Sequence, residues 1–200
     1  GNPVRADIAA LPTPEERFAE RTGAARLLVL GGSQGARALN ERLPEALARL
    51  PDALRPVVHH QCGARHIEAA RAAYANAGVE AEITPFIEDM ASAYGAADLV
   101  IGRAGAMSVW ELAAAGVGAL LVPYPHAVDD HQTVNARWLA DAGAAVVVQE
   151  HELDVERLAQ QLTTLLGDRA GLADRAARAR QLARPDAATT VANIVEEVAR

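Results

Sequence analysis

Lysine is absent from this 200-residue chain, so every basic side chain is an arginine or a histidine. The absence excludes a Walker-type phosphate loop, a Schiff-base enzyme and a lysine general base, because each of them uses a lysine amine. Cysteine is nearly absent as well. Cys62 is the only one, so no internal disulfide can form and a reducing cytoplasm is expected. Its thiol is interpreted as an inert group at a strand end.

Positive charge and long apolar runs are also scarce. The formal net charge is −7 with no basic stripe, which argues against nucleic acid as the main partner. A local cluster of arginines can still hold one phosphate group. No apolar run approaches the roughly 18 residues of a membrane-spanning helix, and the first residues do not resemble a signal peptide. With 50% hydrophobic residues, the chain is expected to form one sizeable, soluble α/β domain.

Short apolar runs alternate with stretches of helical period. The strand-like runs are 26–31, 55–61, 80–86, 98–102, 118–124 and 144–149, and the helical stretches are 36–49, 64–77, 88–96, 106–115 and 131–142. Continuous Val, Leu and Ile runs are typical of parallel strands buried on both faces. The pattern predicts a doubly wound, Rossmann-like parallel sheet of about six strands with the order 3-2-1-4-5-6.

Three parts of the chain differ in pattern. Residues 1–25 are interpreted as a segment leading in from a preceding domain, and 26–150 as the sheet domain. Residues 151–200 lack strand-like runs and predict two or three C-terminal helices of the same domain.

Two loops of small residues follow strands of the predicted sheet. The first strand ends in GGSQG at 31–35, and the fourth is followed by RAGAMS at 103–108. Small residues expose backbone N–H groups, and a helix N-terminus adds its positive dipole end, so both loops favour an anion. The first loop lacks the G-x-G-x-x-G spacing, and the second strand ends in HHQC without the acidic residue of a dinucleotide site. Because strands one and four are neighbours, both loops are expected to converge on one crevice.

Glu111 lies one turn inside the helix that begins after the second loop. It shares a helix face with Met107 and Ser108, whose N–H groups are expected, with those of Gly105 and Ala106, to face a phosphate. The pattern leaves two interpretations of Glu111 open. It accepts hydrogen bonds from both hydroxyls of a ribose, or it stabilises the helix dipole.

Five motifs now occur in order: GNPVR (1–5), GGSQGARALN (31–40), PFIEDM (85–90), RAGAMSVWELAAAG (103–116) and DDHQTVNA (129–136). Together they resemble the C-terminal half of the MurG family, the peptidoglycan N-acetylglucosaminyltransferases that convert lipid I to lipid II. The resemblance covers nearly the whole chain. It implies one half of a two-domain GT-B fold, the half that binds the donor UDP-N-acetylglucosamine. An N-terminal domain absent from this chain would bind the lipid I acceptor and the cytoplasmic side of the bacterial inner membrane.

The resemblance also implies roles for residues of these motifs, and it favours the ribose role of Glu111. The implied donor-site residues are Arg5 and Ser33 at the diphosphate, Ile87 at the uracil edge through its backbone, Ala106, Met107 and Ser108 at the phosphate, Glu111 at the ribose, and Gln132 at the sugar hydroxyls with Asn135 as support. The family commonly has serine where Ala104 stands, so a phosphate contact by that side chain is not expected.

No metal or other cofactor is expected. His126, Asp129, Asp130 and His131 follow the fifth strand, but their spacing matches no common zinc pattern, and the D-x-D motif of metal-dependent sugar transferases is absent. Asp129 and Asp130 are expected instead to cap the helix that begins near His131.

The resemblance implies direct displacement at the anomeric carbon with inversion, while UDP leaves. The general base would come from the absent domain, so no catalytic residue is assigned here and this chain alone is expected to be inactive. Two alternatives remain: an enzyme of the same fold resembling a UDP-N-acetylglucosamine 2-epimerase, and a non-catalytic nucleotide-sugar-binding module. Trp110 and Trp138 are expected to be packing residues, and His59 and His60 to point to opposite faces of the second strand.

Overall fold

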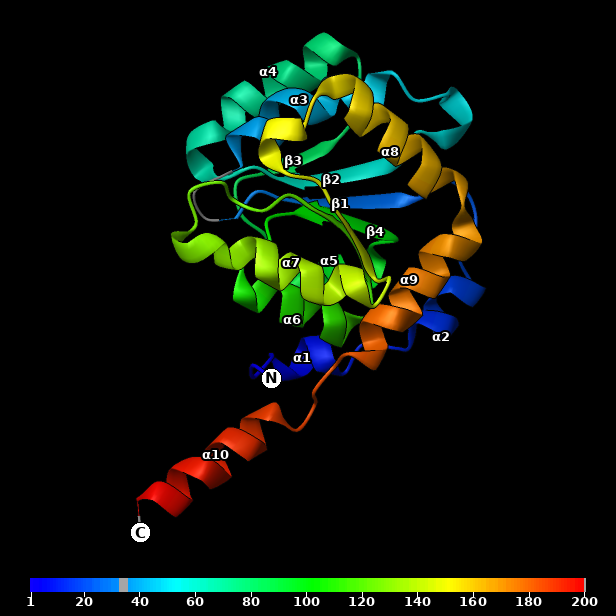
Figure 1. The fold of residues 1–200 in the computed structure, drawn as a ribbon. Helices are drawn as coiled ribbons and strands as arrows, with labels where there is room; N and C mark the ends of the chain where they lie inside the picture. Colours follow the sequence, from blue (N-terminus) through cyan, green and yellow to red (C-terminus); the bar gives the residue numbers. More distant parts are fainter. Residues whose placement is uncertain (33–35, 200) are drawn as a thin grey trace.

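Six parallel strands form one sheet in the computed structural model, which describes residues 1–32 and 36–199 (Figure 1). Its order is β3-β2-β1-β4-β5-β6, so the predicted 3-2-1-4-5-6 topology is confirmed. The strands are β1 (Arg26–Leu30), β2 (Val57–Gln61), β3 (Glu82–Thr84), β4 (Leu99–Gly102), β5 (Gly118–Leu121) and β6 (Ala145–Val147). Each strand is shorter than its apolar run at one end or at both, because the run continues beyond the paired residues.

Helices cover both faces of the sheet (Figure 1). On one face lie α3 (Arg37–Ala48), α4 (Ile67–Ala77) and α8 (Val155–Gly167), and on the other lie α5 (Met90–Ala96), α6 (Ala106–Ala115) and α7 (His131–Asp141). Successive side chains of β1 therefore enter different cores. Leu27 and Val29 pack with the first group of helices, and Leu28 packs with the second.

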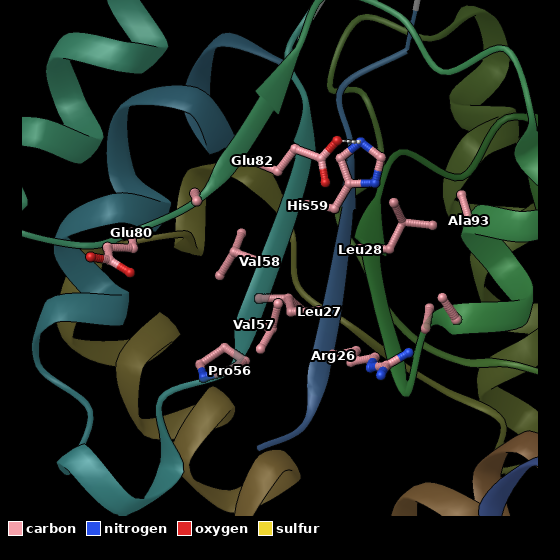
Figure 2. Close-up of a pocket in the computed structure, with 13 residues that line it drawn as sticks. Arg26, Leu27, Leu28, Pro56, Val57, Val58, His59, Glu80, Glu82 and Ala93 are labelled. Carbon is pink, nitrogen blue, oxygen red and sulfur yellow. Dashed lines mark ion pairs between the residues drawn. The ribbon is translucent and has the colours of Figure 1, made fainter. Parts of the chain in front are cut away.

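The second face is covered incompletely near its edge, because α5 is short and lies beside β1. A groove of about 680 Å³ remains beside α5 and across β1, β2 and β3, lined by Leu28, Val57, His59 and Ala93 among others (Figure 2). In the groove, His59 Nε2 lies 3.3 Å from Thr84 Oγ1 and 3.9 Å from a carboxylate oxygen of Glu82.

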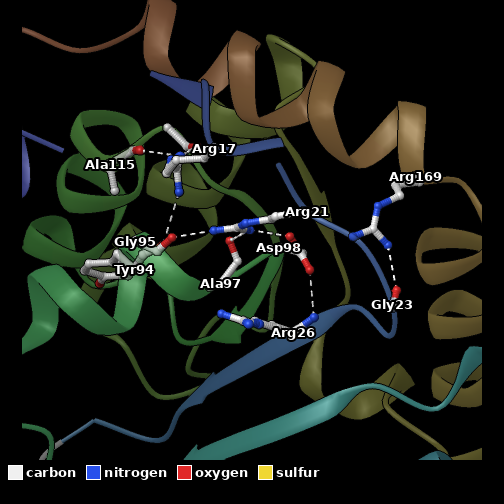
Figure 3. Close-up of polar contacts among 11 residues, drawn as sticks. Arg17, Arg21, Gly23, Arg26, Tyr94, Gly95, Ala97, Asp98, Ala115 and Arg169 are labelled. Atoms are coloured by element: carbon white, nitrogen blue, oxygen red, sulfur yellow. Dashed lines mark hydrogen bonds and ion pairs between the residues drawn. The ribbon is translucent and has the colours of Figure 1, made fainter. Parts of the chain in front are cut away.

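Hydrogen bonds from arginine side chains connect the N-terminal segment to the sheet domain. The segment contains α1 (Ala6–Ala9) and α2 (Pro14–Ala19), and Arg17 of α2 donates to Tyr94 O at 3.3 Å and to Ala115 O at 2.8 Å (Figure 3). Arg21 donates to the carbonyls of Gly95 and Ala97. These carbonyls lie at the C-terminal ends of α5 and α6, where the regular hydrogen bonds of the helix come to an end. Arginine side chains thus complete two helix ends.

In the described residues three α-helices follow β6, at the upper end of the predicted number. After α8, α9 (Arg169–Gln181) lies against α6 and β5, and α10 (Ala187–Val198) extends away from the sheet (Figure 1). Val191, Ile194 and Val195 of α10 are exposed. The division of the chain at residues 25 and 150 stays a prediction.

His60 is the counterpart of His59 on the opposite face of β2, as the alternation of strand residues predicts. It is fully buried, and its Nδ1 lies 3.0 Å from the hydroxyl of Tyr74 on α4. Burial, with a smaller contribution from His59, lowers the pKa of His60 from 6.5 to about 4. The imidazole is therefore neutral in the folded chain at every pH near 7.

His60 predicts a loss of stability in mild acid. Since its pKa is lower in the folded than in the unfolded chain, its contribution is complete above pH 6.5 and is lost as the pH falls towards 4. The full effect is about 3 kcal/mol, at 1.36 kcal/mol per pKa unit. Urea unfolding at pH 7 and pH 5 should show a shallower pH dependence for His60→Phe than for wild type. His151→Gln, which changes an exposed histidine outside the sheet, is the control and should keep the wild-type slope. An unchanged slope in His60→Phe would contradict the assignment.

Candidate functional site

The carboxyl ends of β1 and β4 lie next to each other, with Leu30 opposite Gly102. A Cβ at Gly102 would come within 2.9 Å of Leu30 O, so only glycine allows the two strand ends this close. The loops that follow therefore start side by side at Leu30 and Gly102, and the convergence of their later residues on one crevice stays a prediction. Ser33 and the rest of the first loop to Gly35 lie outside the described residues, so the diphosphate role of Ser33 is untested.

Among the described residues, no side chain caps the first backbone N–H groups of helix α6. Its N-cap residue is Gly105, which has extended backbone angles and no side chain to accept from the first N–H groups. Ala106 and Met107 are exposed, and Ser108 is half-buried. These N–H groups and the positive end of the helix dipole make this end of α6 suited to an anion. The three residues thus lie in the first turn of α6, as the sequence predicted, and their contact with a phosphate stays a prediction.

Gln132 and Asn135 of α7 hold the loop that precedes α6. The side-chain oxygen of Gln132 accepts from the N–H of Ala104 at 3.2 Å and from that of Tyr124 at 3.0 Å. Asn135 Nδ2 donates to Ala104 O at 3.0 Å. Both backbone groups of the buried Ala104 are therefore occupied. Gln132 keeps only its amide N–H groups for a ligand, and Asn135 supports the loop.

Arg103 is a site residue that the sequence reasoning missed. It donates to Val122 O and Pro123 O, both at 3.1 Å, and forms an ion pair with Glu150, with the two side chains 16% and 25% exposed. Its guanidinium also lies over the Tyr124 ring, 5.4 Å from the centroid. Arg103 thereby joins the loops after β4, β5 and β6. Arg103 is the first residue of the motif at 103–116, but no local sequence pattern indicates its partner Glu150, which lies 47 residues away.

Glu111 does not lie in the first turn of α6, which holds no acidic residue. The helix dipole acts mainly within the first turn, so the dipole interpretation of Glu111 loses support. One carboxylate oxygen accepts from the hydroxyl of Tyr94 at 3.1 Å. Burial, together with the charge and hydrogen bond of Glu111, raises the pKa of Tyr94 well above its usual value. Tyr94 therefore orients Glu111 as a neutral donor, and the second carboxylate oxygen stays available.

The loops after β1 and β3 are joined by Gln61 at the end of β2. Its side-chain oxygen accepts from Gly32 N at 3.1 Å, and its Nε2 donates to Gly32 O at 3.2 Å and Pro85 O at 3.1 Å. In the sequence, Gln61 was noted only because the second strand ends without the acidic residue of a dinucleotide site. After Pro85 come Phe86, whose ring is 69% exposed, and Ile87, whose side chain is buried in the core. The apolar side chain of Ile87 is thus used in packing, which leaves its backbone as the group for recognition.

Arg5 lies at the amino end of α1, which packs against α5 and α6. Its Nε is 3.5 Å from a carboxylate oxygen of Asp7, and both side chains are about half exposed. Hydrogen bonds from Ser92 lower the pKa of Asp89, and the charge of Arg5 lowers it further. Arg5 is therefore near the start of α5, without a described contact to Glu111.

The aspartates before α7 do not act as predicted. Asp129 and Asp130 have φ of 51° and 50°, and Asp130 at the N-cap makes no side-chain capping bond. A capping side chain needs extended backbone to reach the next N–H groups, and left-handed backbone does not provide it. Within residues 1–32 and 36–199, no three His, Cys, Asp or Glu side chains gather as a metal site would require. The rings of Trp110 and Trp138 contact each other at an angle of 40° with centroids 4.3 Å apart, and both pack against the core of the second face.

Comparison with known proteins places the chain in a family. The sequence profile of the glycosyltransferase family 28 C-terminal domain matches residues 26–191. A protein of Aromatoleum aromaticum named UDP-N-acetylglucosamine--N-acetylmuramyl-(pentapeptide) pyrophosphoryl-undecaprenol N-acetylglucosamine transferase is 59% identical over 199 residues, covering 100% of this chain and 55% of the relative. A protein of the same name from Ralstonia nicotianae is 58% identical, with the same coverage. The chain thus spans about half the length of the curated relatives it matches.

Solved structures agree with these relatives. The crystal structure of Acinetobacter baumannii MurG has a TM-score of 0.89 and 45% identity, covering 95% of this chain and 55% of that one. WaaG, a glycosyltransferase involved in lipopolysaccharide biosynthesis, has a TM-score of 0.68 at 22% identity over 96% of this chain and 54% of its own, and shares the fold. The resemblance drawn from the five motifs is confirmed.

Arg103 generates a stability prediction. Arg103→Ala should lower the free energy of unfolding by about 2 kcal/mol, because it leaves the poorly exposed Glu150 without a cation and two carbonyls without a donor. Adding Glu150→Gln should recover part of the loss, since no charge then stays unpaired. Arg71→Ala, which removes an exposed pair with Glu68, is the control and should have no measurable effect in urea unfolding. Wild-type stability in Arg103→Ala would show that Glu150 needs no partner.

Proposed function

The chain belongs to the glycosyltransferase family 28 C-terminal domain family, and from this premise we propose that it is the donor-binding half of a longer transferase. The enzyme would transfer N-acetylglucosamine from UDP-N-acetylglucosamine to lipid I, giving lipid II. The names of the relatives from Aromatoleum aromaticum and Ralstonia nicotianae support this substrate pair. They also favour a transferase over the alternative that resembles a 2-epimerase.

One observation carries the proposal: the amino end of α6 has no side-chain cap among the described residues and follows the carboxyl end of β4, which pairs with that of β1, and Glu111 lies about one turn further along the helix. The N–H groups of Ala106, Met107 and Ser108 would bind the diphosphate, assisted by Arg5 and Ser33. Glu111 would accept from both ribose hydroxyls, and its bond from Tyr94 presets the direction of its carboxylate. A phosphate and a ribose at this spacing match a nucleoside diphosphate.

The other groups of the site would recognise the two ends of the donor. The backbone of Ile87 would pair with the uracil edge, beside the exposed ring of Phe86, which offers an apolar surface to a flat base. At the other end, the amide N–H groups of Gln132 would donate to hydroxyls of the N-acetylglucosamine ring. Asn135 would keep the intervening loop in place.

The reaction would be a displacement with inversion, in which the acceptor hydroxyl forms a bond to the anomeric carbon and the bond to the UDP oxygen breaks. Negative charge then grows on the leaving diphosphate. The backbone N–H groups, the dipole of α6 and Arg5 would stabilise that charge without a metal ion. The general base that removes the acceptor proton would belong to the part of the relatives that this chain does not cover.

The acceptor and membrane contacts are likewise proposed for that other part, at the cytoplasmic face of the inner membrane. In the described part of this chain, no helix combines the length and apolar character that crossing a bilayer requires. The role that remains for this half is to bind and activate the donor.

The proposal predicts binding without turnover. In calorimetry this 200-residue chain should bind UDP and UDP-N-acetylglucosamine, and it should transfer no sugar to lipid I. Binding should persist in EDTA, because backbone N–H groups and arginine supply the positive potential. Absence of UDP binding would overturn the proposal, and so would binding that requires added Mg²⁺. Turnover by a longer chain that includes the preceding domain separates the transferase from a non-catalytic module.

Glu111 predicts a ligand-specific effect. Glu111→Ala removes two charge-assisted hydrogen bonds to the ribose, and we expect a loss of about 2 kcal/mol, or about thirtyfold in UDP affinity. Wild type should prefer UDP over its 2′,3′-dideoxyribose analogue, and the variant should bind the two nearly alike. The helix should be retained, because alanine is a good helix former.

Tyr94→Phe is the matched control for orientation, because it keeps the Glu111 charge and removes only the hydroxyl that positions it. Its loss of UDP affinity should be smaller than that of Glu111→Ala, with the preference for UDP over the analogue retained. If Glu111→Ala keeps the wild-type preference, the ribose is held elsewhere.

A further inference from the structure

A second cavity lies at the amino ends of the strands, away from the candidate site at their carboxyl ends. It measures about 380 Å³ and is bordered by α2, the connection from α2 to β1, the end of α5 and the start of α9 (Figure 3). Its charged lining residues are Arg17, Arg21, Arg26, Arg169, Glu20 and Asp98. Four guanidinium groups thus face two carboxylates, in a chain whose net charge is −7. The local sign of charge is opposite to that of the whole protein.

Two of these arginines are largely engaged inside the protein. Arg21 forms an ion pair with the buried Asp98 and donates to the carbonyls of Gly95 and Ala97. Arg17 donates to carbonyls at the ends of α5 and α6. Their positions are therefore fixed, and their charges cannot move away from the cavity.

The other two arginines have donors to spare. Among the described residues, the side chain of Arg26 has no hydrogen-bond or ion-pair partner, and Arg26 donates to Asp98 only through its backbone N–H. In Figure 3 the Arg26 side chain extends away from Asp98. Arg169 uses one nitrogen, which donates to Gly23 O at 3.0 Å. Most N–H groups of these two guanidiniums are therefore free to bind a ligand.

Arg17 shows that the positive charge here is not fully compensated. The residue is 9% exposed, and its Nε–H is buried without an acceptor in the described part of the chain. Burial, with smaller contributions from the charges of Arg21 and Arg180, lowers the pKa of Arg17 to about 10. An anion in the cavity would relieve this repulsion.

We propose that this cavity is a binding site for a phosphate group, either free or in the headgroup of an anionic phospholipid. Arg26 and Arg169 contact the phosphate oxygens, while Arg17 and Arg21 supply positive potential from fixed positions. Guanidinium groups match phosphate because their planar N–H donors bind two oxygens at once. Glu20, on the rim of the same cavity, limits the number of negative charges that the site accepts. The site is independent of the proposed transferase function.

The test uses this chain saturated with UDP, so that the candidate donor site is filled. Inorganic phosphate is titrated in calorimetry, and sedimentation is measured with vesicles of phosphatidylglycerol and of phosphatidylcholine. Arg26→Gln and Arg169→Gln should each lower the affinity for phosphate, or for phosphatidylglycerol vesicles, about fivefold. This is the size of effect expected for partly exposed charge pairs. Arg71→Gln, an equal charge change on α4, is the control and should leave the affinity unchanged. UDP affinity should be the same in all variants, which separates this proposal from the transferase proposal.

The two measurements, phosphate calorimetry and vesicle sedimentation, identify the source of the phosphate group. Saturable binding of inorganic phosphate without vesicle binding assigns a free phosphate ligand, and binding to phosphatidylglycerol but not phosphatidylcholine vesicles assigns a lipid headgroup. The proposal is overturned if neither probe binds, or if Arg26→Gln and Arg169→Gln respond like Arg71→Gln.

Discussion

Arginine side chains hydrogen-bond to the carboxyl end of helix α6, whereas no described side chain caps its amino end. The candidate site depends on this difference between the two ends. Arg17 and Arg180, from segments at opposite ends of the chain, donate to the carbonyls of Ala114 and Ala115. The helix is thereby fixed without any capping group at Gly105. A helix fixed in this way can leave its first N–H groups for a ligand, because its stability does not depend on them.

Arginine side chains and backbone N–H groups also account for two regions of positive potential, one at each end of the sheet. At the carboxyl end, the potential comes from backbone N–H groups and a helix dipole, which are neutral overall and cost little to keep near core residues. At the amino end it comes from guanidinium groups. In a chain without lysine, the positive groups available to a pocket are histidines, the planar guanidinium groups of arginines and the backbone N–H groups.

Local sequence patterns were enough to predict much of this architecture. They were not enough to predict contacts between residues that are far apart in the sequence. The span 106–115 for α6 is confirmed to the residue, because glycines border it on both sides. The strand order follows from alternating apolar runs and the right-handed crossover. Arg103 and Gln61 were missed because their partners lie in other loops. The predicted caps at Asp129 and Asp130 were wrong, since sequence alone does not reveal their left-handed backbone.

Gln132 illustrates how such a pairing limits chemistry. From the sequence, its amide offers both an acceptor and donors to a sugar. In the structure its oxygen is used by the N–H groups of Ala104 and Tyr124, so only the donors remain. The side chain is also fixed, because rotating the amide would leave two backbone N–H groups without an acceptor, at a cost of about 1–3 kcal/mol for each that is buried. A ligand at this position must therefore present acceptor oxygens, and a sugar hydroxyl does so when its own proton is directed elsewhere.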